Sequence, residues 1–493
     1  GRVLVLLGGG LARVTSHWGG TSLPGRVALW LYPSLLSDLA SVYQRILVVT
    51  GTNGKTTTAR ALAEIMRQSC HYEVIAANPE GANLLSGVAT ALLKHAKVFL
   101  RPRARDRRIA VLEVDEGTME KLCRRVRLDL VVVTNIFRDQ LDRYWELGRL
   151  ADSLRRALEL QPQAKLILNA DDPLVASLGR DRPDAVYYGL SASDHSAGSP
   201  EYPSGLWLTQ ETRDNPLCPA CGHPLIYSRY RYSHLGEYYC PRCSFARPQA
   251  HYTAKPVLNE GQASMILYCR DRVLQLPLAL RGTYNCYNAL AAAAAALELG
   301  VDQGCVAQVL AFFTPGQGRA EEFYIGHSRC TLVLVKNPTG VSEALRAIKE
   351  RCNGLPDGSG ESREEFAILL AINDLAADGR DVSWLWDCDW SPLLDSDWAR
   401  VICSGLRAYD LAVCLKYFGL DPGKIKVIPS LKRGLRTLIS SSARHPFREV
   451  FVLCTYTNLS KARTILRKVR AERLGDREDK DWVSIPRAAQ PLR

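Results

Sequence analysis

The chain has 493 residues, which is too long for one hydrophobic core, so about two or three domains are expected. A hydrophobic fraction of 47% and a charged fraction of 23% are ordinary for a soluble globular protein and exclude a long disordered chain. The net charge of +12 comes partly from the arginine-rich segment 101–108, which is either a solvated loop or attracted to a polyanion such as nucleic acid, an acidic membrane or a pyrophosphate.

The N-terminal segment 1–44 starts with an apolar run that is too short to span a bilayer, and we expect the segment to be helical. Fifteen cysteines occur along the chain, four of them in a tight cluster. The others are scattered through apolar segments such as 411–418 and 449–457, as is typical of buried, reduced thiols. A cytosolic location is therefore favoured over a secreted one.

Residues 46–175 alternate between strand and helix patterns. Short apolar runs predict buried strands, and the stretches 57–68 and 148–160 between them predict helices. This alternation predicts an α/β fold with a mainly parallel sheet and helices on both faces. The predicted strands are 46–50, 109–114, 129–135 and 165–170.

The first predicted strand leads into a glycine-rich loop and then a helix, which is the arrangement that phosphate binding requires. In this loop Lys55 can neutralise phosphate charge, and the Thr56 hydroxyl can hold Mg²⁺. Val49 stands where the usual G-x-x-x-x-G-K-[ST] pattern has its first glycine, which indicates a variant class rather than a generic ATPase. The predicted nucleotide-binding residues here are Gly51, Thr52, Asn53, Gly54, Lys55, Thr56 and Thr57.

Acidic residues end two of the later strands. Glu113 and Asp115 close the strand 109–114, and Asp139 and Asp142 follow the next one. The ends of parallel strands meet at the sheet edge that carries the phosphate loop, where a carboxylate is a natural Mg²⁺ ligand. We expect this role for Glu113, whereas Asp139 and Asp142 fit a structural ion pair equally well.

Residues 191–260 break the α/β pattern and contain the cysteine cluster. Its spacing, C-x₂-C-x₁₈-C-x₂-C, is that of a zinc ribbon in which four thiolates close a structural Zn²⁺ site. A ribbon that binds nucleic acid is possible, but an insertion in an ATPase domain favours a structural or interface role. The expected zinc ligands are Cys218, Cys221, Cys240 and Cys243, within a ribbon at about 205–255.

The last third of the chain predicts a second α/β domain. An alanine-rich helix within 275–300 precedes a Pro/Gly hinge at 314–319, after which strands and helices alternate again. We expect a helical N-terminal segment at 1–44, a central ATP-binding domain at 45–314 and a Rossmann-like C-terminal domain at 315–493. Its predicted strands are 330–337, 366–373, 400–405, 425–430 and 448–455.

Several segments resemble the Mur ligase family, the ATP-dependent amide-forming enzymes of peptidoglycan synthesis. The matches to its central domain are TGTNGKTTT (50–58), TNIFRDQLDR (134–143), LNADDP (168–173) and GTYNCYNALAA (282–292). Within the family, the chain is similar to the MurT branch. That narrower resemblance rests on the four-cysteine insertion and on EGANLLSG (80–87), EVDEG (113–117), VKNPTG (335–340) and NDLAADGRDVSWLWD (373–387).

This resemblance implies amidation of the α-carboxyl of the stem-peptide D-glutamate of lipid II, giving D-isoglutamine. ATP would activate the carboxylate as an acyl phosphate, and a GatD-like glutamine amidotransferase partner would supply ammonia. The expected cofactors are ATP, Mg²⁺ and structural Zn²⁺. The lipid substrate implies work at the inner face of the plasma membrane, and no nucleic-acid partner is expected.

The resemblance also assigns roles to residues of the ATP site. Lys55 and Thr56 would hold the phosphates and Mg²⁺, and Glu113 would be a second Mg²⁺ ligand. Nucleotide contacts are further implied for Asn285 and Asn288 near the base, for Arg319 from the hinge, and for Asn337 in the Lys-Asn-Pro motif.

One aspartate of the DGRD segment would complete the Cys-His pair of the partner as a catalytic triad. We expect this residue to be Asp381, with Asp374 and Asp378 as rivals. Two departures from the family pattern, Trp145 and Leu375, could alter the substrate pocket or the interface.

Two other functions compete with this interpretation. A stand-alone ligase that adds an amino acid, like other Mur ligases or folylpolyglutamate synthase, would share the phosphate loop but need neither the cysteine insertion nor the DGRD segment. A nucleic-acid-binding ATPase would explain the ribbon and the positive charge, and it would bind nucleic acid with a steep salt dependence.

Overall fold

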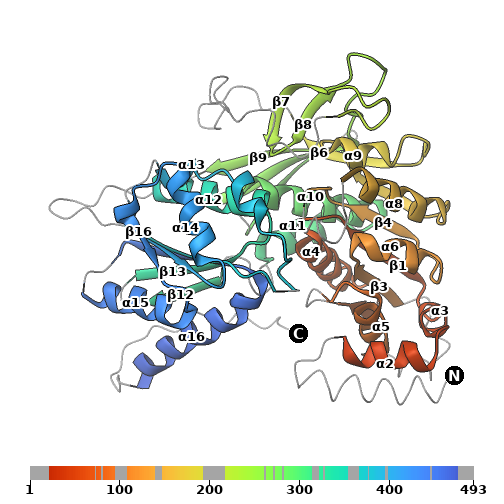
Figure 1. Cartoon of the computed structure of the whole chain (residues 1–493). Helices are drawn as coiled ribbons and strands as arrows, with labels where there is room; N and C mark the ends of the chain where they lie inside the picture. The colour runs from red at the N-terminus through yellow and green to blue at the C-terminus, as the bar shows by residue number, and fades with distance from the viewer. Residues whose placement is uncertain are drawn as a thin grey trace. The chain divides into compact units, whose positions relative to one another are not determined.

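The structure is a computed structural model, and its elements form two compact units, Gly1–Gln317 and Gly318–Arg493 (Figure 1). No helix in the described part of the chain combines the length and the apolar character needed to cross a membrane. The described residues are 22–72, 74–78, 82–94, 108–138, 147–191, 217–259, 262–269, 272–279, 282–313, 321–325, 328–353, 366–375, 377–394, 398–444 and 447–475.

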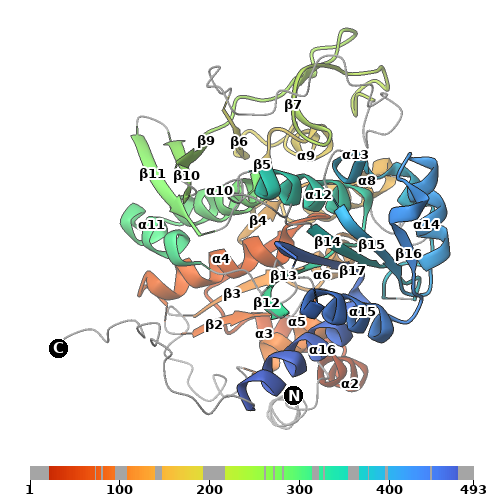
Figure 2. The same cartoon turned by 90° about the vertical axis from the view of Figure 1, so that its left-hand side faces the viewer.

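The N-terminal unit is built on a nine-stranded sheet with the order β11-β10-β9-β6-β5-β4-β1-β3-β2. The four predicted strands, β1, β3, β4 and β5, pair in parallel as expected, and β2, β6 and β9 extend this parallel part. Strands β9, β10 and β11 pair antiparallel with one another and make the sheet mixed (Figure 2). The strands are β1 Arg45–Thr50, β2 Val74–Ala77, β3 Arg108–Glu113, β4 Leu130–Val133, β5 Lys165–Asn169, β6 Val186–Leu190, β9 Tyr252–Asn259, β10 Gln262–Cys269 and β11 Arg272–Leu278.

Helices cover both faces of this sheet because its central strands are apolar on both sides. In β1, Leu47 and Val49 face one core, whereas Ile46 and Val48 face the other. The first core is covered by α4 Lys55–Gln68, α10 Thr283–Glu298 and α11 Gln303–Phe312. The second is covered by α2 Leu23–Leu31, α3 Leu35–Ala40, α5 Leu85–Lys94, α6 Glu116–Cys123, α8 Leu147–Glu159 and α9 Pro173–Ser177.

The alanine-rich helix α10 lies deep in the first core, and its residues Ala291 to Ala296 are fully buried. Alanine combines high helix propensity with a small side chain, so α10 can lie close against its neighbours. It packs along α4, the helix that follows the phosphate loop (Figure 1). Residues at the start of α10 therefore come close to that loop.

The cysteine insertion forms a hairpin between β6 and β9. Strands β7 Ile226–Tyr232 and β8 Leu235–Tyr239 pair antiparallel through a two-residue turn at Ser233 and His234. A small core that includes Leu225 and Tyr238 packs this module on Ala176 of α9.

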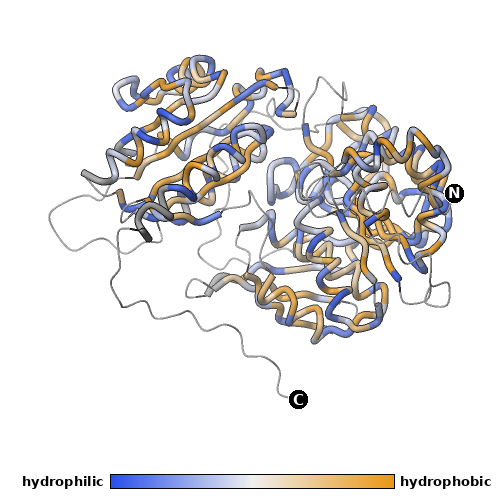
Figure 3. The backbone as a smooth tube through the Cα atoms, turned by 90° about the horizontal axis from the view of Figure 1, so that it is seen from below, coloured by the Kyte–Doolittle hydropathy of each residue, from blue (hydrophilic) through white to orange (hydrophobic). Residues whose placement is uncertain are grey.

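The C-terminal unit has a six-stranded sheet with the order β12-β13-β17-β14-β15-β16, in which only the edge strand β12 is antiparallel among the described pairs. Figure 3 shows hydrophobic strand segments flanked by helices of mixed character, as expected of a buried parallel sheet. The strands are β12 Glu321–Ile325, β13 Ser328–Leu334, β14 Phe366–Ala371, β15 Trp398–Ser404, β16 Ile425–Val427 and β17 Glu449–Cys454.

Helices also cover both faces of this second sheet. One face carries α12 Pro338–Asn353, α13 Ser391–Leu394, α14 Ala408–Tyr417 and the 3₁₀ helix η4 Ser383–Asp387, and the other carries α15 Leu431–Arg444 and α16 Tyr456–Gly475. A second 3₁₀ helix, η5 Pro422–Lys424, leads into β16. Strand β12 is absent from the sequence-based expectation, and the Rossmann-like assignment stays a prediction.

Candidate nucleotide and metal sites

The phosphate loop lies between β1 and α4 and depends on glycine at two positions. Gly51 and Gly54 have φ angles of +119° and +84°, a region that favours glycine. A Cβ on Gly51 would lie 2.3 Å from Thr134 Oγ1, and one on Gly54 would lie 2.0 Å from Asn288 Oδ1. Both positions therefore require glycine, because a side chain there would clash with Thr134 or with Asn288.

The segment after β4 fastens this loop. Thr52 N donates to Asn135 O at 2.8 Å, and Asn53 N donates to Asn135 Oδ1 at 2.8 Å. Thr134 Oγ1 donates to Asn53 O at 2.8 Å. These bonds join Thr52 and Asn53 of the glycine loop to the TNIF segment, so the two sequence motifs form one structure.

Lys55 begins α4 and its side chain is buried. Its Nζ donates to Thr52 O at 3.1 Å and to Glu116 Oε2 at 3.1 Å, and it also bonds the carbonyl of Gly51. The ammonium is therefore held against the loop, close to the helix N-terminus that would face a phosphate. Glu116 was not singled out in the sequence, although it lies in the EVDEG segment.

Glu113 ends β3 beside the phosphate loop, because its backbone pairs in register with Val49 of β1. Its N and O atoms bond the side chain of Asn78 at 2.8 and 2.7 Å. The carboxylate is only 3% exposed, and Oε2 has no hydrogen-bond partner among the described residues. A buried carboxylate oxygen without a donor is costly unless a cation binds it, so the site fits a hard divalent ion such as Mg²⁺.

The structure places two more predicted residues at the loop. Asn288 of α10 lies against Gly54, and its Nδ2 donates to Asn285 Oδ1 at 3.3 Å. Thr58 Oγ1 reaches the carbonyl of Asn288 at 3.4 Å. Asn288 thus lies beside the first turn of α4, which also carries the half-buried Thr56 and the buried Thr57, and Asn285 contacts Asn288.

Several predicted features lie outside the described residues. These are Asp139, Asp142, Trp145, Arg319, the arginines of 101–107 and the apolar N-terminal run.

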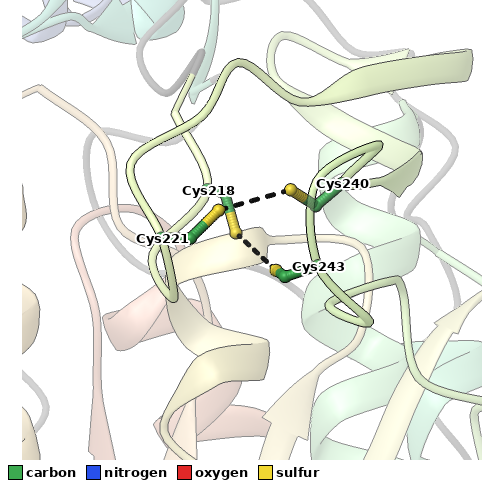
Figure 4. Close-up of side chains that lie close together, drawn as sticks. All are labelled: Cys218, Cys221, Cys240 and Cys243. Atoms are coloured by element: carbon green, nitrogen blue, oxygen red, sulfur yellow. Dashed lines mark hydrogen bonds between the residues drawn. The ribbon is translucent and has the colours of Figure 1, made fainter.

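The four cysteines come together at the end of the β7–β8 hairpin away from its turn (Figure 4). Their Sγ atoms all lie within 4.8 Å of one another, with 3.7 Å between Cys218 and Cys243 and 3.5 Å between Cys221 and Cys240. Four thiolates at about 2.3 Å from one zinc ion would be about 3.8 Å apart, so the cluster has the size of a tetrahedral zinc site.

Backbone groups add to the stability of thiolates in this cluster. Ala220 N lies 3.4 Å from Cys218 Sγ, and Arg242 N lies 3.4 Å from Cys240 Sγ. In the metal-free cluster the pKa shifts of the thiols oppose one another: burial raises the pKa of Cys218 to about 12, whereas backbone hydrogen bonds and neighbouring thiols lower that of Cys240 to about 6 against the effect of burial. Four sulfur donors at this spacing suit a soft divalent metal.

The LNADDP motif contributes two fully buried carboxylates that the sequence did not identify as site residues. Asp172 caps α9 through Leu174 N and Val175 N and also accepts from Ile136 N at 2.7 Å. Asp171 accepts from Arg247 Nε at 2.6 Å and from the Tyr287 hydroxyl at 2.6 Å.

Three aspartates of the C-terminal unit have different surroundings. Asp378 is 3% exposed and accepts from Thr457 N at 2.8 Å and from Thr457 Oγ1 at 2.6 Å, so it secures the start of α16. Asp374 pairs with Arg407 Nε at 3.0 Å. Asp381 is half-buried, and its Oδ1 accepts from Ser383 N at 2.8 Å at the start of η4.

An apolar stripe lies on the exposed side of α14. Tyr409, Val413 and Tyr417 follow one another at four-residue spacing and are 66%, 47% and 76% exposed. Trp386 of η4 joins this stripe, with its ring 6.1 Å from that of Tyr417. Leu375, one of the departures from the family pattern, is also exposed. Asn337, by contrast, is buried at the start of α12, where Oδ1 accepts from Gly340 N at 2.8 Å.

Two family models match the chain. The Mur ligase middle domain matches residues 49–205, and the MurT ligase C-terminal model matches residues 334–459. Together these matches include the phosphate loop, Glu113 and Asp381.

Curated relatives share most of the chain. It is 33% identical over 91% of its length to a protein of Streptococcus pneumoniae named lipid II isoglutaminyl synthase (glutamine-hydrolyzing) subunit MurT, and this match covers 92% of that protein. A Staphylococcus aureus protein of the same name is 31% identical over 80% of this chain and 83% of its own length.

Solved structures support the fold. A pseudomurein peptide ligase type C from Methanothermus fervidus is 23% identical, with a TM-score of 0.65 over 87% of this chain and 79% of its own. MurF from Acinetobacter baumannii is 15% identical, with a TM-score of 0.62 over 90% of this chain and 80% of its own. The fold is therefore that of the Mur ligases.

Proposed function

This chain belongs to the MurT family of Mur ligase-like proteins, and we propose that it amidates the D-glutamate α-carboxyl of lipid II, using ATP and ammonia from a glutamine amidotransferase subunit. One observation carries the proposal. The glycine loop with its buried Lys55 lies after β1, and the buried Glu113 Oε2, which has no hydrogen-bond partner among the described residues, lies at the end of the neighbouring strand β3. We also propose the domain limits 45–314 and 315–493.

In this reaction the substrate carboxylate attacks the γ-phosphorus of ATP, and ADP leaves. Lys55 and the N-terminal turn of α4 neutralise the charge of the phosphates, and Thr56 and Glu113 hold Mg²⁺. Magnesium, when bound, screens charge on the transferring phosphoryl group. Asn285, Asn288, Arg319 and Asn337 are proposed as further nucleotide contacts.

Ammonia then attacks the acyl carbon of the acyl phosphate. Inorganic phosphate leaves with the pair of electrons from the broken C–O bond, and the nitrogen loses a proton. The product is an amide, so the net reaction consumes one ATP for each amide formed. A site of this kind works mainly by positioning the reactants and neutralising charge.

The four cysteines are proposed to hold structural Zn²⁺. Their sulfur separations and their thiolate-stabilising backbone bonds support a closed tetrahedral site. All four positions are filled by protein sulfur, so no position is left for a reacting water.

We propose that the partner is a GatD-like amidotransferase and that Asp381 completes its Cys-His pair. Support comes from the surroundings of the three aspartates, since Asp378 is fully engaged at α16 and Asp374 pairs with Arg407. The apolar stripe of α14 and Trp386 gives this unit a surface suited to another protein. Free, mainly buried thiols favour a cytoplasmic location, and the lipid substrate favours the inner face of the membrane.

The function is tested by co-purifying the chain with a glutamine amidotransferase and incubating the complex with lipid II, ATP and glutamine. We expect a mass change of one carboxyl to one amide per lipid II, and we expect Lys55→Ala to abolish it. The isolated chain should hydrolyse no glutamine but should amidate with ammonium. Activity with only a free amino acid would instead identify a stand-alone ligase, and salt-dependent nucleic-acid binding without amidation would identify a nucleic-acid-binding ATPase.

A further inference from the structure

The turn of the cysteine-bearing hairpin packs on a residue next to the phosphate loop. The ring of Phe137 lies 4.6 Å from that of His234 and 5.5 Å from that of Tyr232, both in edge-on contact. Tyr232 and His234 flank or form the turn between β7 and β8, and Phe137 and His234 are fully buried. Edge-on aromatic pairs in a packed core stabilise a defined geometry.

The backbone of Phe137 at the same time bonds the phosphate loop. Its N–H donates to Thr52 Oγ1 at 3.0 Å, and the Thr52 hydroxyl donates to its carbonyl at 3.2 Å. Thr52 lies between the two glycines that shape the loop. One residue thus contacts the hairpin through its ring and the phosphate loop through its backbone.

A second link runs in parallel through Asp172. Its Oδ2 accepts from Ile136 N at 2.7 Å and lies 3.4 Å from His234 Nε2. Both His234 and Asp172 are fully buried, so water does not weaken this pair. The residue before Phe137 is therefore linked to the turn of the hairpin through Asp172.

We propose that the hairpin positions the phosphate loop, so that metal binding by the four cysteines and nucleotide binding by the loop are coupled. Two of the cysteines precede β7 and two follow β8, so the cluster fixes one end of the hairpin. The turn at the other end contacts Phe137 directly and Ile136 through Asp172. Strand β8 has five residues and spans about 17 Å. His234 and Phe137 are positioning residues that need not touch the nucleotide.

This coupling must be reciprocal. If zinc orders the hairpin and thereby the loop, bound nucleotide must tighten zinc binding by the same free energy. The inference rests on the proposed role of the loop at Gly51–Thr56 in binding ATP, and it concerns binding rather than turnover. It can therefore be measured on the full chain without lipid II or the amidotransferase.

The test compares three variants of the zinc-loaded chain by calorimetric titration with ADP and Mg²⁺. Phe137→Leu and His234→Ala should weaken ADP binding about two- to tenfold, the range that corresponds to losing an aromatic contact. Tyr238→Phe is the matched control, because its hydroxyl ties the same hairpin to Ala170 O at 2.9 Å without reaching the loop. Its ADP affinity should equal that of the unaltered chain.

Two further measurements separate coupling from general destabilisation. At equilibrium with a chromogenic chelator, the chain should keep more of its zinc when ADP and Mg²⁺ are present, and this difference should shrink in Phe137→Leu. Removing zinc should weaken ADP binding in the unaltered chain but have little further effect in Phe137→Leu, because both changes act on one path.

The proposal is overturned if the unaltered chain binds ADP equally well with and without zinc, or if ADP leaves the zinc affinity unchanged. A different failure would refute the ATP site itself: an unaltered, zinc-loaded chain that binds nucleotide no better than Lys55→Ala. If zinc removal unfolds the unit, the ADP titrations of the zinc-loaded Phe137→Leu, His234→Ala and Tyr238→Phe variants decide the question, and equal affinities in all three overturn the proposal.

Discussion

Replacing Asp381 by asparagine tests the proposed role of this carboxylate toward the partner separately from its local structural role. In the structure, Asp381 Oδ1 accepts one hydrogen bond from Ser383 N at 2.8 Å, and an asparagine amide oxygen can accept the same bond. The free energy of unfolding should therefore change by less than about 0.5 kcal/mol. Any large loss of activity would have to come from the missing charge.

Asp378 provides the contrast within the same segment. It accepts two bonds from Thr457 near the start of α16 and is almost fully buried. Asp378→Ala should cost about 2 kcal/mol, because a buried cap and a charge-assisted bond are lost together. Asp374→Asn should have a small effect on stability, since the ion pair with Arg407 is partly exposed.

The assay is amidation of lipid II by the complex with its amidotransferase, supplied with either glutamine or ammonium. Without a carboxylate to orient the partner's histidine, Asp381→Asn should slow the glutamine-dependent reaction by about 100-fold or more. The ammonium-dependent reaction should keep the rate of the unaltered complex. Unchanged glutamine-dependent turnover, or a parallel fall with ammonium, would refute the assignment of Asp381.

Three further predictions concern the N-terminal unit and the thiols. Glu113→Gln should leave the free energy of unfolding within about 1 kcal/mol, because Oε2 makes no hydrogen bond, but should raise the Mg²⁺ concentration needed for ATP-dependent turnover about tenfold or more. Zinc should be lost from the four-cysteine cluster as the pH falls, because protons compete with the metal for the thiolates; a chelator titration at graded pH measures this. In the zinc-loaded chain, iodoacetamide at mildly alkaline pH should label the exposed Cys70 first, because the proposed zinc protects the exposed Cys221 and burial raises the pKa of thiols such as Cys454 to about 12; peptide mass mapping will show the order.

The parts of the site that the sequence predicted are those encoded locally. A glycine loop between a strand and a helix forms within a few residues, and parallel strands bring Glu113 to the same edge by a general rule of sheet geometry. The cysteine spacing is likewise local at each pair, and the cluster has the expected size. The identity of the family followed from these motifs and agrees with its relatives.

The residues that the sequence did not identify make contacts between distant segments. Asn78 holds Glu113 from 35 positions away, and Phe137 holds Thr52 from 85 positions away. Neither has a side-chain type that marks a site by itself. The strand β9 was missed for another reason: Pro256 interrupts the strand pattern, yet it pairs with Met265 of β10 in the antiparallel part of the sheet.

The tandem aspartates after β5 explain why the cysteine insertion and the ATP-binding domain depend on each other. Asp171 is fully buried, and its charge is met by Arg247, which the insertion supplies, and by the Tyr287 hydroxyl of α10. Burial acts to lower the pKa of Arg247, but the Asp171 carboxylate raises it above its usual value. A chain without the insertion would leave a buried carboxylate without its cation, at a cost of about 3–5 kcal/mol. The insertion is therefore a structural part of the unit that carries the glycine loop, since the neighbouring Asp172 bonds Ile136, in the segment that contacts the loop.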